Sequence, residues 1–352
     1  MSDERSASSV FANLVRRTVR VVAALAVAAC VGESVARLYL YEPRSLDPEF
    51  GYVIADGATT TCFKEGAGIG HWGPRGVRRT GLPAERGAPL LVLGDSFTEA
   101  VHVNDEECYT GRLARILAAG APSMRVLNAG VAGRSAADYV HLAPAYTSVF
   151  RPEWTVVQMT SADLGHEAFD PGSTHFELVA GGRLRTVALP PAGRGGGLRR
   201  ALRALRARSA LLANASIQIR SFETLMTEFR PFHQSAAPAV RVAANDASFP
   251  VELELGMLRE AFGSRLTLLF LGRYGTREED ATELRVRRYC AETGSSCVFL
   301  RDAFARFDRA AGPPYGFPNT GFGTGHLNAT GHREAARLVA DELTRLARRG
   351  LL

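Results

Sequence analysis

Short hydrophobic runs alternate with longer amphipathic stretches over most of the chain after residue 88. The runs have the length and the apolar content of buried strands, and they occupy residues 90–93, 124–127, 154–159, 266–271 and 297–300. Apolar residues recur with helical spacing over residues 106–119, 135–148 and 277–291, and in a last helix that stops near Gly350. Strands that alternate with helices predict an α/β fold in which helices cover both faces of a parallel sheet.

One long stretch, residues 166–260, does not follow this alternation. It opens with a predicted hairpin over residues 176–187 that turns at Gly181-Gly182. A loop follows, and then an arginine-rich helix over residues 198–212. The stretch is interpreted as an insertion that contacts the substrate or packs against the N-terminal segment.

The N-terminus has the order of a secretion signal or signal anchor. Three basic residues, Arg16, Arg17 and Arg20, precede an apolar run over residues 21–32. This run is shorter than the roughly 20 residues of a full span, so residues up to 41 would have to continue the helix through the far interface. Arginines before the run place the N-terminus in the cytoplasm and the rest of the chain outside it. The predicted order is a tail and signal anchor over residues 1–41, an extended, Gly-, Pro- and Arg-rich lead-in over 42–87, and a catalytic domain over 88–352.

Three alternatives to a retained anchor stay open. Val27-Ala28-Ala29-Cys30 fits a lipoprotein cleavage site, which would leave Cys30 as a lipidated N-terminus. Ordinary signal peptidase could also cut in the small-residue sequence between residues 26 and 29. The third alternative is an amphipathic helix buried in a cytosolic protein, which would remove the argument for export.

Charge and cysteine content exclude several classes of function. The net charge is +6, but Lys64 is the single lysine and no basic stripe is interleaved with aromatic residues, so we expect no nucleic-acid partner. None of the five cysteines forms a cluster with zinc spacing, and we expect no metal and no cofactor. Cys290 and Cys297 lie close enough in sequence for a disulfide in an oxidising compartment, with two buried free thiols as the alternative.

The candidate chemistry lies where the predicted strands end, because ligands of an open parallel sheet bind at the carboxyl ends of its strands. The first strand ends in Gly94-Asp95-Ser96, which exposes a serine on a tight turn. The second ends in Asn128-Ala129-Gly130, and the third in Thr160-Ser161-Ala162-Asp163. Gly325-His326-Leu327-Asn328 and a second histidine, His332, open the final helix.

These motifs, in this order, resemble the SGNH (GDSL) hydrolase superfamily over about residues 88–348. The resemblance implies a flavodoxin-like three-layer sandwich with a parallel sheet. It also implies Ser96 as the nucleophile, the N–H groups of Ser96 and Gly130 as oxyanion donors, and His326 as the general base. His332 matches a residue that supports the start of the helix.

Two positions depart from the family pattern. The asparagine that donates to the oxyanion is replaced by Ala162, for which Ser161, Thr160 or Gln158 are the substitutes near the same strand end. The triad aspartate is replaced by Gly323, so His326 is expected to be oriented by a backbone carbonyl or by a distant residue such as Asp302. Asp95 and Asp163 are expected to organise their turns through hydrogen bonds to the backbone.

The resulting prediction is an extracytoplasmic serine esterase that transfers an acyl group from an ester to water. Its expected substrates are O-acyl groups on envelope or exported polysaccharide, or lipid esters. A transferase that passes the acyl group to a sugar hydroxyl is the first alternative. A non-catalytic carbohydrate-binding or assembly module is the second, favoured by Ala162 and Gly323.

Overall fold

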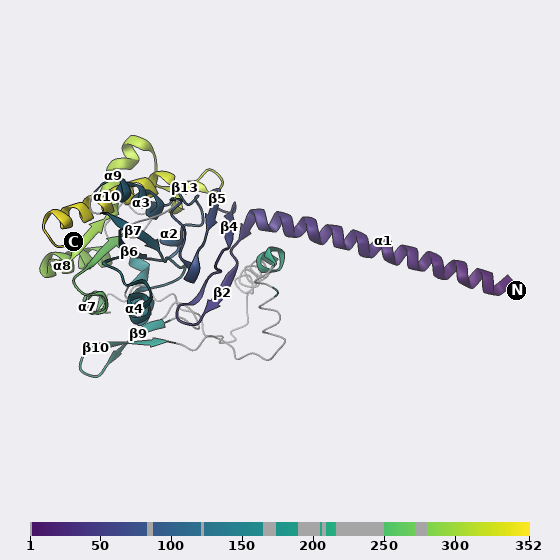
Figure 1. Ribbon diagram of the computed structural model, residues 1–352, viewed down its shortest axis with the longest axis horizontal. Helices are drawn as coiled ribbons and strands as arrows, with labels where there is room; N and C mark the ends of the chain where they lie inside the picture. Colours follow the sequence, from purple (N-terminus) through teal and green to yellow (C-terminus); the bar gives the residue numbers. More distant parts are fainter. Residues whose placement is uncertain are drawn as a thin grey trace, which may run out of the picture.

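A computed structural model gives the architecture of the chain (Figure 1). The backbone is described for residues 2–82, 87–120, 123–164, 174–188, 205, 209–215, 250–271 and 280–352. Most of the helix predicted over residues 198–212 lies outside these ranges, as does the predicted start of the helix over 277–291.

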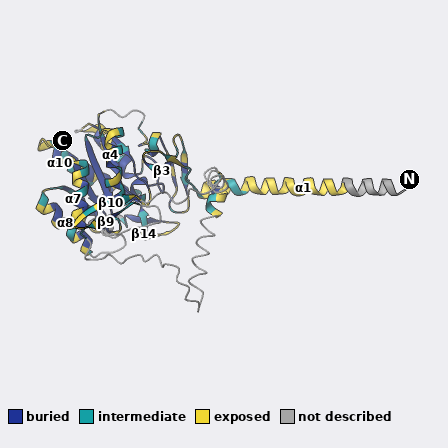
Figure 2. Ribbon diagram, turned by 90° about the horizontal axis from the view of Figure 1, so that it is seen from below, coloured by how far each residue is buried: buried dark blue, intermediate teal, exposed yellow. Residues whose placement is uncertain are grey.

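The centre of the molecule is a five-stranded parallel sheet of strand order β12-β11-β8-β6-β7. It consists of β6 (Ala88–Leu93), β7 (Met124–Asn128), β8 (Trp154–Met159), β11 (Leu266–Phe270) and β12 (Ser296–Phe299). All five correspond to the hydrophobic runs of the sequence, which are nearly continuous because both faces of the sheet are buried (Figure 2). This confirms the predicted α/β fold with a parallel sheet.

Helices cover the two faces of the sheet and complete a three-layer sandwich. On one face, α3 (Tyr109–Ala119) and α10 (Ala329–Arg348) pack against side chains such as Leu90 and Val92. The other face, with Leu91 and Leu93, is covered by α4 (Ala136–Phe150), α7 (Val251–Phe262) and α8 (Ala281–Thr293). A further helix, α9 (Leu300–Ala311), lies against α10.

The chain begins with one long helix, α1 (Ser2–Tyr39), which projects from the domain (Figure 1). Its stretch Asn13–Tyr39 is 27 residues long and contains an 18-residue window with a mean hydropathy of 1.8 that is almost entirely exposed. It is therefore long and apolar enough to cross a membrane, a property that it shares with signal sequences. The apolar run over residues 21–32 is alone too short to span a membrane, but the helix continues beyond it to Tyr39.

Residues 42–82, predicted to be part of an extended lead-in, fold onto the sandwich together with Leu40 and Tyr41, which were predicted to end the anchor. They form the small antiparallel sheet β1-β4-β5 and the hairpin β2-β3, with bounds β1 (Leu40–Tyr41), β2 (Arg44–Asp47), β3 (Gly51–Ile54), β4 (Thr59–Cys62) and β5 (Gly68–His71). Arg78 fastens this region to the domain, since its buried guanidinium donates to the carbonyls of Glu99, Ala100 and Val103 and pairs with Asp105 at 2.9 Å. The sequence does not predict these strands, because two to four residues are too few to show the alternation of apolar and polar positions that marks a strand.

The insertion differs from its prediction at its C-terminal end. The hairpin β9 (Thr174–Val179) and β10 (Arg183–Ala188) is present and turns through Gly181-Gly182, both at positive φ. However, α7 begins at Val251, inside the range assigned to the insertion, and its side chains belong to the central core.

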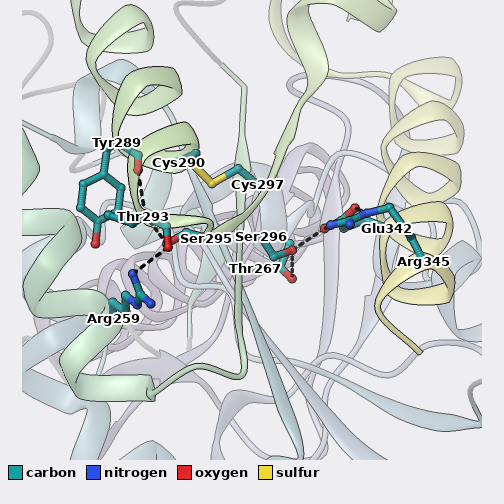
Figure 3. Close-up of a disulfide and its surroundings, with 10 residues drawn as sticks. All are labelled: Arg259, Thr267, Tyr289, Cys290, Thr293, Ser295, Ser296, Cys297, Glu342 and Arg345. Atoms are coloured by element: carbon teal, nitrogen blue, oxygen red, sulfur yellow. Dashed lines mark hydrogen bonds and ion pairs between the residues drawn. A yellow bond between two sulfur atoms is a disulfide. The ribbon is translucent and has the colours of Figure 1, made fainter. Parts of the chain in front are cut away.

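A disulfide joins Cys290 of α8 to Cys297 of β12 (Figure 3). It closes the loop for which the sequence leaves two alternatives. The neighbouring polar side chains are also paired, with Arg259 donating to the carbonyl of Thr293 at 3.2 Å and Ser296 donating to Glu342 at 2.6 Å. The side chains around the disulfide are thus joined by hydrogen bonds. The disulfide lies away from the carboxyl edge of the sheet.

Candidate active site

Ser96 stands at the start of a one-turn helix, α2 (Ser96–Glu99), directly after β6. The turn is tight because a side chain at Gly94 would collide with Thr98 and Gln158. Asp95 Oδ1 accepts the N–H of Phe97 at 2.9 Å and thereby caps the turn, in agreement with its predicted structural role. Burial raises the pKa of Asp95 to about 6, although the hydrogen bond from Phe97 acts in the opposite direction.

His326 lies near the end of β14 (Gly321–Leu327), the strand that leads into α10. Its Nε2 is 2.9 Å from Ser96 Oγ, so the two residues predicted to be nucleophile and base are in hydrogen-bond contact. The ring packs against Phe97, at a centroid distance of 5.0 Å, and stacks on His102, at 3.8 Å. Contact with these two rings fixes the imidazole plane that the contact with Ser96 requires.

Glu65, and neither a backbone carbonyl nor Asp302, orients His326. One carboxylate oxygen of Glu65 is 2.8 Å from His326 Nδ1, and the other accepts the backbone N–H of His326 at 2.7 Å. Burial alone would raise the pKa of Glu65, but the hydrogen bonds from His326 lower it to about 2. The expectation for Asp302 is wrong, because this residue is exposed on α9 and pairs with Arg287 at 2.9 Å.

Sequence reasoning missed Glu65 because the residue lies in the aperiodic region before the sheet, 261 positions from its histidine. A weak local signal is present in the neighbouring glycine, Gly66. This residue has a φ of 74°, and a side chain there would collide with the backbone of His102. The loop also bonds to Asn319, whose Oδ1 accepts the N–H of Gly66 at 3.0 Å. These constraints fix the position of the carboxylate.

His102 is a second histidine at the site and was also not predicted. It is buried, its ring stacks on that of His326 at an interplanar angle of 20°, and its Nε2 lies 3.6 Å from Glu65. Burial, reinforced by the neighbouring His326, lowers the pKa of His102 to about 3, so the ring is neutral at ordinary pH.

Glu65, His102 and His326 could each offer one ligand atom to a metal ion, since these atoms lie within 4.8 Å of one another. The lone pairs of an imidazole nitrogen lie in the plane of its ring. Because the two imidazoles are stacked nearly parallel, their lone pairs do not converge on one point, as tetrahedral zinc requires. The arrangement suits proton transfer from Ser96 better than metal binding.

The N–H of Gly130, predicted to be an oxyanion donor, donates to Asn128 Oδ1 at 3.0 Å. A side chain at this position would collide with the backbone of Thr98 and Glu99, so the glycine permits β7 to approach the Ser96 turn. Gly133, three residues further along the same loop, lines the cavity at Ser96 instead. The oxyanion role of Gly130 stays a prediction, and Gly133 is the glycine of this loop that lines the cavity.

A cavity of about 320 Å³ opens beside Ser96. It is lined by polar side chains and glycines, together with one large apolar residue, Phe97. The lining consists of Asp95, Ser96, Phe97, Gly133, Arg134, Ser135, Thr160, Ala162, Asp163, Gly325 and His326.

None of the three side chains that were considered as substitutes for the missing amide at Ala162 is directed at Ser96. Ser161 donates to Asp280 at 2.5 Å. The Thr160 hydroxyl donates to Asp163 at 2.9 Å and accepts the N–H of Ala162. Asp163 therefore organises its turn, as predicted for it.

Gln158, the third of these side chains, is buried below the Ser96 turn. Its Oε1 accepts the hydroxyl of Thr98 at 2.8 Å and the N–H of Asp95 at 3.2 Å. The amide therefore supports the turn from beneath and does not reach the cavity side of Ser96. Backbone N–H groups and Arg134, which lines the cavity, are left as the donors for an oxyanion within the described part of the site.

Replacing Ala162 with asparagine is therefore expected to raise turnover on an activated ester, by up to ~10²-fold where the new amide reaches the oxyanion. The increase should appear in kcat more than in KM, because the bond forms chiefly in the transition state. Steady-state kinetics of the variant measure the effect, with Ala162→Leu, which is similar in size to asparagine but has no donor, as the control. An unchanged or lower kcat in a folded Ala162→Asn protein would count against an oxyanion at this position.

His332 supports the site from behind. Its Nδ1 accepts the N–H of Tyr109 at 3.2 Å and so joins α10 to the start of α3. Burial lowers the pKa of His332 well below its usual value, which keeps the ring neutral and able to accept this bond. The side chain of Asn328 caps α10 through the N–H groups of Thr330 and Gly331. His332 therefore supports the start of α3, whereas the start of α10, for which its role was predicted, is capped by Asn328.

Several solved structures are similar to this chain at low sequence identity. A catalytic mutant of Axe2, an acetylxylan esterase from Geobacillus stearothermophilus, is 16% identical, with 74% of this chain and 96% of that chain covered and a TM-score of 0.39. TesA is 16% identical, with 73% and 99% covered and a TM-score of 0.39. LAE5, an alpha/beta hydrolase enzyme from the metagenome of Lake Arreo in Spain, is 18% identical, with 76% and 99% covered and a TM-score of 0.37.

A comparison with curated protein sequences found no match. The family model of the GDSL-like lipase/acylhydrolases matches residues 92–334, which is more than half of the chain. This range contains the end of β6 and the turn of Ser96, the other four strands of the sheet, and the strand β14 that carries His326. The chain therefore belongs to the GDSL-like lipase/acylhydrolase family, whose members hydrolyse ester bonds.

Proposed function

We propose that this GDSL-family acylhydrolase is a membrane-anchored, extracytoplasmic serine esterase with the triad Ser96, His326 and Glu65. The observation that carries the proposal is the unbroken series of contacts from Ser96 Oγ to His326 Nε2, at 2.9 Å, and from His326 Nδ1 to Glu65, at 2.8 Å. A nucleophile, a base and a carboxylate that orients the base are the three parts of serine acyl transfer.

In the proposed reaction, His326 Nε2 takes the proton of Ser96 while Ser96 Oγ attacks the ester carbonyl. The carboxylate of Glu65 stabilises the imidazolium that forms. The backbone N–H groups of Ser96 and Gly133 are the proposed oxyanion donors, since the N–H of Gly130 is bonded to Asn128. His326 then protonates the leaving alcohol, and water, deprotonated by the same histidine, releases the acyl group and regenerates Ser96.

The described lining of the cavity favours a short acyl group on a polar alcohol over a lipid ester. A long acyl chain requires an extended apolar surface, whereas Phe97 is the one large apolar side chain in the described lining of this cavity. An acetyl group fits a volume of about 320 Å³. O-acyl groups on envelope or exported polysaccharide are therefore the proposed substrate.

Two features support a location outside the cytoplasm. The basic residues Arg16, Arg17 and Arg20 precede the apolar part of α1, the charge order that leaves the following domain on the far side of the membrane. The disulfide between Cys290 and Cys297 is of the kind that persists in oxidising compartments. The same helix supplies the proposed anchor.

Aryl acetate is expected to be a better substrate than aryl palmitate by at least ~10-fold in kcat/KM, because most methylenes of the longer chain find no apolar surface to bury. The comparison uses the full chain in detergent with both esters below their critical micelle concentrations. A preference for palmitate would overturn the polysaccharide proposal in favour of a lipid substrate.

The same assay in intact spheroplasts tests the location. A sulfonated aryl acetate that does not cross the inner membrane should be hydrolysed equally well before and after lysis. Activity that appears only after lysis would place the catalytic domain in the cytoplasm and contradict the proposal. The Ser96→Ala variant, assayed in both preparations, gives the background rate of hydrolysis.

A further inference from the structure

The imidazole rings of His102 and His326 lie face to face. Their centroids are 3.8 Å apart and their planes differ by 20°, whereas Phe97, the other ring in contact with His326, is tilted by 44° at 5.0 Å. In serine acyl transfer, the base becomes positively charged when it takes the proton of the nucleophile. His102, from the loop between α2 and α3, therefore presents its ring face to the group on which positive charge develops.

The backbone of His102 is fixed against the loop that carries Glu65. Its carbonyl accepts the N–H of Ala67 at 3.2 Å. A side chain at Gly66 or at Gly68 would collide with the backbone of His102, so both glycines permit this close approach. The loop that places the carboxylate beside His326 thus also fixes the position from which the second imidazole stacks.

The edges of the His102 ring make few polar contacts. Its Nδ1 is buried and has no hydrogen-bond partner among the described residues. Its Nε2 lies 3.6 Å from a carboxylate oxygen of Glu65, beyond the usual length of a hydrogen bond. The carboxylate favours the tautomer with the proton on Nε2, because a lone pair there would face a negative charge. The face of the ring is therefore its main contribution to the site.

His102 is neutral at ordinary pH. Burial, reinforced by the charge of His326, lowers the pKa of His102 to about 3. A neutral aromatic face attracts a cation, whereas a second imidazolium at this distance would repel it. The other charged and titratable groups that act on the two rings are Glu65, Lys64, Arg78, Asp95 and His332.

We propose that His102 is a positioning residue whose neutral ring face stabilises the imidazolium form of His326 during acyl transfer. This role rests on the proposed function, in which His326 takes the proton of Ser96. An imidazolium is a flat, delocalised cation, so stacking places its charge over the π electrons of the neighbouring ring. An aliphatic side chain of similar size would fill the space but would not attract the charge.

Three substitutions in the full chain separate the face of His102 from its edge. His102→Leu removes both the aromatic face and the N–H, His102→Gln keeps an N–H donor without the face, and His102→Phe keeps a face without the donor. The parameters kcat and KM for an aryl acetate are measured over the acidic and neutral pH range. Thermal unfolding shows that each variant is folded. The matched control is His141→Leu, which removes an exposed histidine of α4.

His102→Leu should lower kcat by roughly 10-fold with little change in KM, because the transition state carries the imidazolium and the bound ester does not. The acidic limb of the kcat/KM profile should move to lower pH by up to about one unit, since the charged form of the base has lost stabilisation. His102→Gln should behave in the same way and decides the question if His102→Leu does not fold. His102→Phe should keep kcat within about 3-fold of wild type and leave the acidic limb in place. His141→Leu should match the wild type.

The groups around the two rings stay in place in all of these variants, so a difference between variants reports position 102. An acidic limb that does not move in His102→Leu and His102→Gln would overturn the proposal, and a loss of kcat without that shift would mean that His102 only fills space. Equal losses in His102→Phe and His102→Leu would show that the aromatic face has no part. Wild-type values in His102→Gln would assign the effect to the N–H and also overturn the proposal.

Nuclear magnetic resonance of isotopically labelled histidine separates failure of this inference from failure of the proposed function. The ring signals of His326 are assigned by their absence in His326→Asn, and their titration midpoint should be lower in His102→Leu than in the wild type. A protein that shows this shift but hydrolyses no ester would contradict the proposed function and leave the stabilisation of the imidazolium standing. An active esterase without the shift would keep the proposed function and remove the role of His102.

Discussion

Ser96→Ala is expected to abolish esterase activity, with a loss of the order of ~10⁶ in kcat, the magnitude found when the serine of a serine hydrolase triad is removed. The reason is that no other hydroxyl in the described cavity contacts His326, so no alternative nucleophile is activated. Labelling by a fluorophosphonate probe should disappear together with the hydrolysis of aryl acetate. The thermal unfolding temperature should hardly change, because the substitution removes one hydrogen bond from a partly exposed side chain.

Ser135→Ala is the matched control for this experiment. Ser135 lines the same cavity, but its hydroxyl lies 3.4 Å from Asp138 at the start of α4 and makes no described contact with His326. This variant should keep both its labelling and most of its activity. If Ser96→Ala kept wild-type turnover, or if labelling were lost in Ser135→Ala instead, the nucleophile would be wrongly identified.

Glu65→Gln is expected to lower kcat by ~10³–10⁴ while the protein stays folded. The glutamine amide has the shape of the carboxylate, but an NH₂ group, which donates hydrogen bonds, replaces one of the two carboxylate oxygens. To pair with an amide N–H, His326 Nδ1 must lose its proton, and Nε2 then carries it and cannot accept the proton of Ser96. The negative charge that stabilises the imidazolium is lost as well.

The pH dependence sharpens this prediction. Since the pKa of Glu65 is about 2 in the wild type, the carboxylate stays charged throughout the range of an ordinary assay. The loss of activity in Glu65→Gln should therefore persist as the pH rises from neutral values. Asp302→Asn is the control, because this carboxylate pairs with Arg287 at the surface and should affect activity little. Wild-type turnover in Glu65→Gln, or a large loss in Asp302→Asn, would contradict the assignment.

The sequence predicted the sandwich well because its signal is local. A strand such as β8 is buried on both faces, so its hydrophobic run coincides with the element from Trp154 to Met159. The helix α9 was missed: its first residues directly follow β12, and the apolar run that marks the strand continues into the helix. The end of the insertion was also misplaced. The helix α7 carries Glu252 and Glu254 among its first residues, and these charged residues obscure the apolar pattern of a core helix.

The residues of the candidate site likewise differ in whether the neighbouring sequence identifies them. Ser96 and His326 each lie in a motif that a few neighbouring residues make recognisable, and tertiary structure brings the two motifs together. Glu65 has no such motif, because a carboxylate on an aperiodic loop is identified only by what it touches. Gly130 shows the converse case, in which a motif is recognised but its glycine is required for close packing against the backbone of Thr98 and Glu99.

The loop that carries Glu65 is bonded to the end of α1, since the carbonyl of Tyr39 accepts the N–H groups of Phe63 and Lys64 at 2.8 and 3.0 Å. The unit that can catalyse is therefore larger than the stretch that the family model matches, residues 92–334. A soluble fragment trimmed to that stretch would contain Ser96 and His326 but would lack Glu65, the carboxylate that contacts His326 Nδ1. A fragment designed for expression should therefore begin on the N-terminal side of Tyr39. Inactivity of a shorter fragment would say nothing about the activity of the enzyme.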